Sequence, residues 1–146
     1  MTKLKKHIKN GFTLVELLVV IVILAILASI ALPKFLGHTQ RGKESKLASD
    51  LKTIRSAVDA FYADTGYLPV KLNDLASNTA PTQARDNTGN LVSLDPSDWH
   101  GPYLESIPKD PFLNANYAYI INGPELGKVK SLSNRIGSNG VAYSQW

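Results

Sequence analysis

One carboxylate stands inside a long apolar stretch near the start of the chain. Between Lys9 and Lys34 the only ionisable side chain is that of Glu16, and from Leu17 to Leu32 the only polar side chain is the hydroxyl of Ser29. An acidic residue at the centre of a hydrocarbon-embedded helix costs about 2.5 to 3.5 kcal/mol, and less near the interface. Two interpretations stay open. Glu16 either has a partner, or it lies close enough to one aqueous face to reach water.

The stretch that carries this acid has the length of a membrane span. Residues 12–32 form an apolar run that, at about 1.5 Å per residue, covers roughly 30 Å, the thickness of one hydrocarbon core. It is preceded by four lysines, Lys3, Lys5, Lys6 and Lys9. Because positive charge favours the cytoplasmic side, the sequence predicts a single span with the lysine end inside and the rest of the chain outside.

The same lysines account for the net charge of +4. Residues 12–146 hold 12 Lys and Arg against 12 Asp and Glu, so the part expected to fold is formally neutral. It has no basic stripe interleaved with stacking aromatic residues, which argues against binding nucleic acid. The chain has no cysteine, so disulfides, thiolate metal sites and cysteine nucleophiles are excluded.

The residues around Glu16 form a recognisable motif. The segment Gly11-Phe12-Thr13-Leu14-Val15-Glu16 follows the lysine-rich leader and precedes the apolar run and Pro33. It resembles the class III signal of type IV pilins and pseudopilins. That resemblance implies cleavage by a prepilin peptidase between Gly11 and Phe12, N-methylation of Phe12, and a role for Glu16 in assembly. Scission would place an α-amino group four residues from the carboxylate, and in a stack of identical helices the Phe12 amine of one subunit can neutralise Glu16 of another.

An ordinary signal peptidase is the alternative processing enzyme. It could read Ser29-Ile30-Ala31 as a small-x-small site, and the product would be a soluble exported protein that begins at Leu32. This alternative leaves Glu16 unexplained and discards a helical pattern that continues past the cut.

Beyond the span, a proline and a new periodicity follow. Pro33 removes a backbone donor, so a kink or local melting is expected there, with a helix that ends at Leu32 as the alternative. Apolar residues then recur at steps of three and four, which predicts an amphipathic helix that Gly66 terminates. Acids between them, Glu44, Asp50 and Asp59, are interpreted as parts of a solvated, salt-bridged face. The apolar face comprises Leu47, Leu51, Ile54, Val58 and Phe61.

The remaining chain predicts loops and a small sheet. Residues 67–112 are expected to be mainly loops, with a polar surface loop at 77–90. Strands are expected at 117–121 and 129–132, with a weak third at 140–143. The predicted fold class is therefore α+β: a long N-terminal membrane-spanning helix whose C-terminal half packs on a small antiparallel β-sheet. The expected domains are a leader (1–11), a transmembrane helix (12–32) and an extracytoplasmic head (33–146), in which the half-helix extends to about residue 64 and the sheet occupies 116–146.

Three further segments resemble the major pseudopilins of type II secretion systems: Trp99-His100-Gly101-Pro102-Tyr103-Leu104, Ile107-Pro108-Lys109-Asp110-Pro111-Phe112 and Asn116-Tyr117-Ala118-Tyr119. The likeness implies a structural subunit that polymerises with copies of itself from the bacterial inner membrane to drive export of folded proteins. It also implies minor pseudopilins or pilins, an inner-membrane assembly platform and its ATPase as partners. The alternative within the superfamily is a major or minor pilin of a surface type IV pilus, serving adhesion, twitching motility or DNA uptake.

Calcium is the cofactor that this family suggests, because its C-terminal loop typically carries acidic ligands. Residues 131–146 contain no Asp or Glu, whereas calcium usually has carboxylates among its oxygen ligands. The neutral candidates are Asn134, Ser138 and Asn139, for which low affinity is expected. Asp95 with Asp98 is a weaker alternative pair, and no other cofactor is indicated.

No pattern for catalysis stands out. His7, His38 and His100 are scattered without metal-ligand spacing, and the sequence has no nucleophile elbow, P-loop or dinucleotide fingerprint. The chain is therefore expected not to be an enzyme, with a membrane-anchored enzyme or binding module as a remote alternative.

Overall fold

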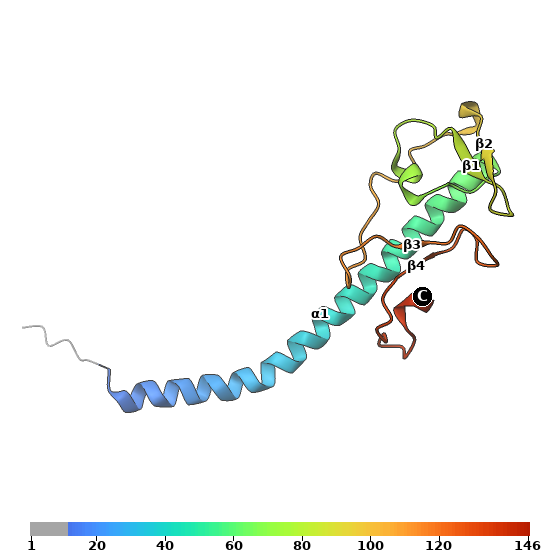
Figure 1. Ribbon diagram of the computed structural model, residues 1–146. Coiled ribbons are helices and arrows are strands. Elements are labelled where there is room, and N and C mark those ends of the chain that lie inside the picture. The colour runs from blue at the N-terminus through green and yellow to red at the C-terminus, as the bar shows by residue number, and fades with distance from the viewer. Residues whose placement is uncertain (1–11) are drawn as a thin grey trace, which may run out of the picture. The chain divides into compact units, whose positions relative to one another are not determined.

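The computed structural model describes residues 12–146 (Figure 1). The leader, including Gly11, lies outside the described residues. The chain divides into two compact units, one that ends at Gln40 and one that spans Arg41–Trp146. We call the described part of the first unit the stem and the second unit the head, and describe each on its own.

The stem is the first part of the long helix α1, which runs from Leu14 to Thr65. Its apolar side chains face outward in every direction, since none of the residues 12–35 is buried. Within the described residues, α1 is the one helix whose length and composition would let it cross a membrane. A helix that is apolar all round is typical of a segment surrounded by lipid or by other helices.

Pro33 lies inside α1, and the helix continues past it without interruption. The alternative in which the helix ends at Leu32 is therefore wrong, and the local melting expected at Pro33 is not found. A bend at Pro33 stays a prediction.

In the head, α1 buries the predicted apolar face. Leu47, Leu51, Ile54, Val58 and Phe61 are all at most 4% exposed, which confirms the periodicity. The helix ends at Thr65, and Gly66 follows with φ of 74° while its N–H donates to the Tyr62 carbonyl at 2.8 Å. A glycine in this left-handed conformation is a common helix stop, so the predicted terminator is confirmed.

After α1 the chain forms a hairpin where the sequence predicted a surface loop. The 3-10 helix η1 (Leu72–Ala76) leads to β1 (Gln83–Arg85) and β2 (Leu91–Ser93), which pair antiparallel with Ala84 opposite Val92. The Asp86 carboxylate closes the connecting turn by accepting hydrogen bonds from the N–H groups of Thr88 and Asn90, both at 2.9 Å. A short helix η2 (Pro96–Asp98) follows.

A second antiparallel pair, β3 (Ala118–Tyr119) with β4 (Val129–Lys130), lies beside α1 in Figure 1. These strands are shorter than predicted. The expected third strand at 140–143 is wrong: the segment makes one isolated bridge between Ile136 and Ala142 and then enters the 3-10 helix η3 (Tyr143–Gln145). The α+β class is confirmed, although the sheet consists of two separate two-stranded pieces.

One hydrophobic core joins these elements to α1. Buried side chains from η1, both hairpins and the C-terminus pack on the helix face: Leu72, Leu75, Ala84, Leu94, Tyr117, Val129 and Tyr143. Aromatic rings extend the core, with Phe61 edge-on to Tyr103 at a centroid distance of 5.6 Å. With no disulfide, this packing must supply the stability of the head.

Candidate functional site

The first turn of α1 contains the acid that the sequence singled out. The Glu16 carboxylate accepts hydrogen bonds from the backbone N–H of Thr13 at 2.9 Å and from its hydroxyl at 2.8 Å. In return the Glu16 N–H donates to the Thr13 hydroxyl at 3.3 Å. This is the reciprocal arrangement of a capping box, in which two helix-end N–H groups gain partners. The spacing Thr-x-x-Glu in the sequence is the signal that could have predicted it.

The capping box leaves Glu16 able to bind a cation. An ionised carboxylate offers about four lone-pair positions, and both Thr13 donors use a single oxygen, Oε2. Phe12 is 81% exposed. The first turn therefore presents an exposed aromatic residue and a carboxylate that is fixed in direction and has spare acceptor capacity. Gly11 is not described, so the structure does not show the proposed cleavage site.

Two hydroxyl groups within the stem find acceptors in its own backbone. Ser29 donates its hydroxyl hydrogen to the Ile26 carbonyl at 2.7 Å, and Thr39 does the same to the Phe35 carbonyl at 3.1 Å. Internal pairing of this kind is what a helix needs where water is absent.

Glu44 is buried, contrary to the expectation of a solvated acid. It is 6% exposed, and its carboxylate accepts hydrogen bonds from the Ser138 N–H at 3.0 Å, the Ser138 hydroxyl and the Tyr143 hydroxyl at 2.8 Å. A buried acid is tolerated only where such donors replace water. Asp50 is half-buried, with Lys46 at 2.8 Å and the Tyr117 hydroxyl at 3.2 Å, whereas Asp59 is exposed as expected. Glu44 thus connects the C-terminal segment, residues 129–146, to the start of the head.

Asp110 is a second buried carboxylate that sequence reasoning did not single out. It is 1% exposed and accepts hydrogen bonds from the N–H groups of Phe112 and Leu113, at 2.7 and 3.2 Å, and from the Ser131 hydroxyl. The Phe112 ring then stacks on Tyr143 at a centroid distance of 4.3 Å. Asp110 therefore connects the 108–113 loop to the same C-terminal segment.

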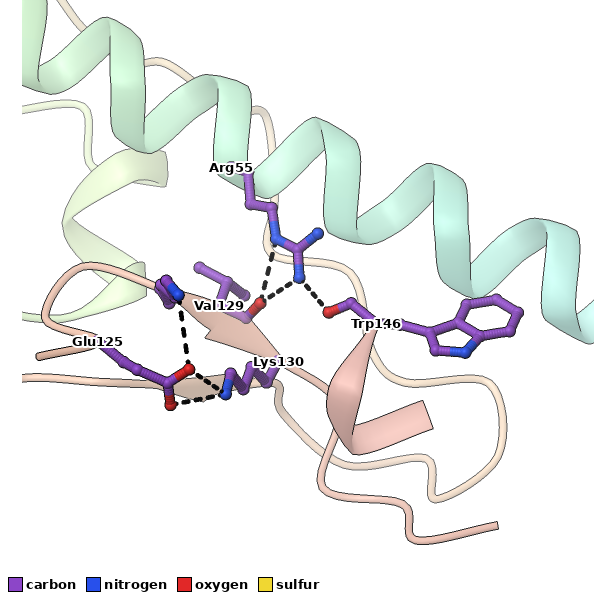
Figure 2. Close-up of polar contacts among 6 residues, drawn as sticks. Arg55, Glu125, Val129, Lys130 and Trp146 are labelled. Carbon is purple, nitrogen blue, oxygen red and sulfur yellow. Dashed lines mark hydrogen bonds and ion pairs between the residues drawn. The ribbon is translucent and has the colours of Figure 1, made fainter. Parts of the chain in front are cut away.

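A third charged group, Arg55, binds the C-terminal segment from the middle of the head helix (Figure 2). Its guanidinium donates to the Val129 carbonyl at 2.8 Å and to the Trp146 carbonyl. Nearby, Glu125 pairs with Lys130 at 2.6 Å, and the hydrogen bond from Lys130 lowers the pKa of the Glu125 carboxyl. Three charged side chains, Glu44, Asp110 and Arg55, thus fix residues 129–146.

The calcium candidates each take part in a hydrogen bond within the head. The Asn134 side-chain oxygen accepts from the Ser144 hydroxyl at 3.0 Å, and the Asn139 side-chain oxygen accepts from the Val141 N–H at 3.0 Å. Ser138 donates to Glu44. The candidates supply no carboxylate, which calcium usually has among its oxygen ligands, and the nearby Glu44 carboxylate already accepts three hydrogen bonds. Low calcium affinity therefore stays a prediction.

In the alternative pair, Asp95 already has hydrogen-bond partners. Asp95 caps η2 by accepting from the Ser97 N–H at 2.9 Å and the Ser97 hydroxyl at 2.8 Å. Residues 12–146 contain no group of three His, Cys, Asp or Glu side chains placed to hold a metal.

The hollows on the described surface are open rather than enclosed. One of about 590 Å³ is lined by Arg41, Glu44, Ser45, Ala48, Ser138 and Trp146. Its one acid is the Glu44 carboxylate, which the loop donors occupy. This hollow therefore contains no pair of groups arranged for acid–base or nucleophilic chemistry.

Comparison with known proteins gives two family matches. Residues 6–32 match the family model described as "Prokaryotic N-terminal methylation motif". Residues 39–130 match the model described as "PilW, C-terminal". No solved structure matches significantly.

Several curated relatives share one name, type II secretion system core protein G. The protein from Vibrio cholerae is 34% identical over 84% of this chain and 77% of its own length. The relative from Klebsiella pneumoniae is 30% identical over 93% of this chain and 89% of its own length. That from Escherichia coli is 31% identical over 86% and 80%, respectively. The similarity therefore covers stem and head together.

Proposed function

Since this chain belongs to the type IV pilin and pseudopilin superfamily, within the family of type II secretion system core protein G, we propose that it is the major pseudopilin of such a system. In that role it is the structural subunit of a filament that polymerises from the inner membrane and helps to export folded proteins. The observation that carries the proposal is the extent of the similarity, 30–34% identity over most of the chain.

Maturation is the first step of the proposal. A prepilin peptidase cleaves between Gly11 and Phe12, and the new N-terminus of Phe12 is methylated. The match of residues 6–32 to the N-terminal methylation motif supports this step. The signal-peptidase alternative would remove all of the helix before Leu32, including the capped first turn.

Assembly uses the charge that maturation creates. The Phe12 amine of one copy neutralises the Glu16 carboxylate of a neighbour, while Thr13 holds that carboxylate through Oε2. An acid that gains an ammonium partner in an apolar medium loses much of its burial penalty, so the pair sets direction and register. Apolar stem surface exchanges lipid for neighbouring stems, which permits the transfer without driving it strongly.

The environment and partners follow from this role. The mature chain sits in the bacterial inner membrane with its N-terminus cytoplasmic and its head periplasmic, and then enters a filament with copies of itself. Prepilin peptidase, minor pseudopilins, an assembly platform and its ATPase act on it. The role is structural and requires no catalytic site in this chain.

Glu16→Gln tests the assembly step sharply. Glutamine retains an oxygen that can accept from Thr13, so the helix cap survives while the negative charge is lost. Glu16→Gln and Glu16→Ala are both expected to insert and to be processed normally, yet to reduce fibre yield at least tenfold. Fibres are measured by shearing and immunoblotting in cells that express the machinery. Glu105→Gln, which removes an exposed acid from the head, is the control and should leave the yield unchanged. Wild-type yield from both Glu16 variants would contradict the assigned role.

A surface type IV pilus subunit is the second candidate. The match of residues 39–130 to the "PilW, C-terminal" model, whose description names no secretion system, is the observation in its favour. Deleting the gene separates the two. Accumulation of folded exoproteins in the periplasm supports secretion, whereas normal secretion with loss of twitching or DNA uptake supports the pilus.

A further inference from the structure

The C-terminal segment has its polarity inverted. Ser131 and Ser133 face the interior and are 2% and 3% exposed, whereas Leu132 and Ile136 are 59% and 61% exposed. Val141, across the turn from Ile136, is also exposed. Polar residues turned inward and large apolar residues turned outward on one segment are informative, because isolated exposed apolar side chains are common but this inversion is not. We call Leu132, Ile136 and Val141 the apolar patch.

The segment that carries the patch is anchored rather than loosely folded. Asp110 binds Ser131, and Glu44 binds Ser138 and Tyr143. Backbone bonds from Tyr143 to the Arg135 carbonyl, at 3.0 Å, and from Ser144 to the Ser133 carbonyl, at 2.9 Å, close the segment on itself. The outward orientation of the patch is therefore fixed by buried polar contacts.

Exposed cations border the patch. Arg135 lies between Leu132 and Ile136 in the chain, and its guanidinium is 5.8 Å from the centre of the Phe112 ring. The Lys43 ammonium lies 5.9 Å from the centre of the same ring. The acids at this end, Glu44 and Asp110, are buried among donors and do not offset these charges at the surface. We call this region, with exposed Arg41, the basic end of the head.

The opposite end of the head helix is acidic. Asp64 accepts from the Tyr103 hydroxyl at 2.8 Å and lies 3.7 Å from the His100 ring, which in turn contacts the Asp98 carbonyl. Four exposed carboxylates belong to the last turns of α1 and to η2 with its N-cap: Asp59, Asp64, Asp95 and Asp98. Hydrogen bonds from the Ser97 N–H and hydroxyl lower the pKa of Asp95. We call this region the acidic end.

The acidic end also carries an exposed apolar residue. Leu91 on β2 is 50% exposed and pairs with Arg85, which itself bridges to Leu68 just beyond the end of α1. Two cations also lie at this end: the Arg85 guanidinium is turned to the Gly89 carbonyl at 2.7 Å, and exposed Lys71 lines a hollow with Gln83 of β1. In Figure 1 the β1–β2 hairpin lies at the far end of the head helix from the C-terminal segment. One head therefore has two complementary surfaces. One combines the apolar patch with positive charge, and the other combines Leu91 with negative charge.

We propose that the heads of successive copies dock end to end, with the apolar patch and basic end of one copy on Leu91 and the acidic end of another. The occupant is a second copy because the complementary charges and the exposed leucine lie on the same chain. About 21 residues of α1 separate Lys43 from Asp64, roughly 32 Å at 1.5 Å per residue, so one head cannot satisfy both surfaces itself. Such a contact is heterologous, and unless the rotation closes, repetition gives an open helical array. The inference rests on the proposed filament function and assigns it a head contact separate from the Glu16 pair.

The absence of cysteine makes a direct test available. Leu91→Cys and Ile136→Cys each replace an exposed side chain with no core role. In fibres of the double variant, mild oxidation is expected to give a ladder of covalent dimers, trimers and higher species, because each copy carries both halves of the contact. Each single variant should give no ladder. Asn78→Cys with Ile136→Cys is the matched control, since Asn78 is exposed but lies outside both surfaces.

The outcomes separate the two proposals. Fibres that form normally without a ladder in the double variant overturn the head contact and leave the filament function standing. A dimer from Ile136→Cys alone means that two patches meet face to face, which also overturns it. Absence of fibres from the wild-type chain would instead count against the filament function.

Charge reversal gives an independent measurement. Lys43→Glu with Arg135→Glu, or Asp59→Lys with Asp98→Lys, should each lower fibre yield at least fivefold, and the combination of all four should restore most of it. Lys128→Glu, which reverses an exposed charge beside Glu125, is the control. If the basic-end variant instead forms fibres normally but loses binding to phosphatidylglycerol vesicles, the basic end faces lipid headgroups and the proposal is wrong.

Discussion

At the scale of single residues, the sequence indicated a special role for one acid, Glu16, but not for another, Glu44. Glu16 was recognisable from its apolar neighbours and its motif, and its partner Thr13 is three residues away. Glu44 looked like any surface acid between cations, because its partners Ser138 and Tyr143 are 94 and 99 residues distant. Local patterns detect contacts along one helix turn, whereas contacts closed by the tertiary fold leave no such trace.

The hydrogen bonds of Glu44 lead to one prediction about stability, and the loop that they hold leads to one about calcium. Glu44→Ala leaves the Ser138 and Tyr143 donors without their acceptor, which should lower the free energy of unfolding by about 1–3 kcal/mol. Millimolar calcium or EDTA should leave the wild-type melting temperature unchanged, because residues 131–146 supply no carboxylate to bind the ion. Both are measured by thermal and urea denaturation of the detergent-solubilised chain. Asp59→Asn is the control, and a calcium-dependent rise in melting temperature would show that the loop does take the ion.

At the scale of elements, periodicity predicted the helix well and the sheets poorly. The spacing of Leu47, Leu51 and Ile54 gave the buried face, and Gly66 gave the end. The β1–β2 hairpin was missed because its strands are three residues each and only Ala84 of them is fully buried, so their alternation is weak. The turn chemistry of Asp86 and Gly89 was the available signal, and the composition of 77–90 masked it.

Two glycines, Gly42 inside α1 and Gly66 just after it, should respond to alanine substitution with opposite changes in the free energy of unfolding. Gly66 has φ of 74° with open space where a Cβ would lie, so Gly66→Ala should cost about 1–2 kcal/mol through backbone strain alone. Gly42 is helical and equally uncrowded, so Gly42→Ala should stabilise the helix by about 0.5–1 kcal/mol. Urea denaturation followed by circular dichroism compares them. Equal effects of both substitutions would mean that the helix does not end at Gly66 in solution.

At the scale of the whole molecule, the sequence predicted the superfamily because the leader motif and the apolar run are local features. The relatives named type II secretion system core protein G extend that likeness over the head. The inverted polarity of Ser131 to Ile136 could not be foreseen, since only the fold shows which of these residues face the interior.

Processing is the prediction at this scale. Intact-mass spectrometry of the protein purified from membranes should show a chain that begins at Phe12 and carries one added methyl group. Gly11→Leu should block cleavage and leave the full-length mass. A wild-type chain that begins at Leu32 would mean that an ordinary signal peptidase acts on it and would remove the basis for assembly through Glu16.

The boundary between Gln40 and Arg41 is a suitable point at which to divide the chain. Every residue described as buried follows that boundary, beginning with Glu44. A recombinant fragment that starts at Arg41 therefore retains every residue described as buried, and it should fold and stay dissolved in aqueous buffer without detergent. By the same reasoning, a chimaera that carries the stem of another filament protein keeps every buried residue of the head.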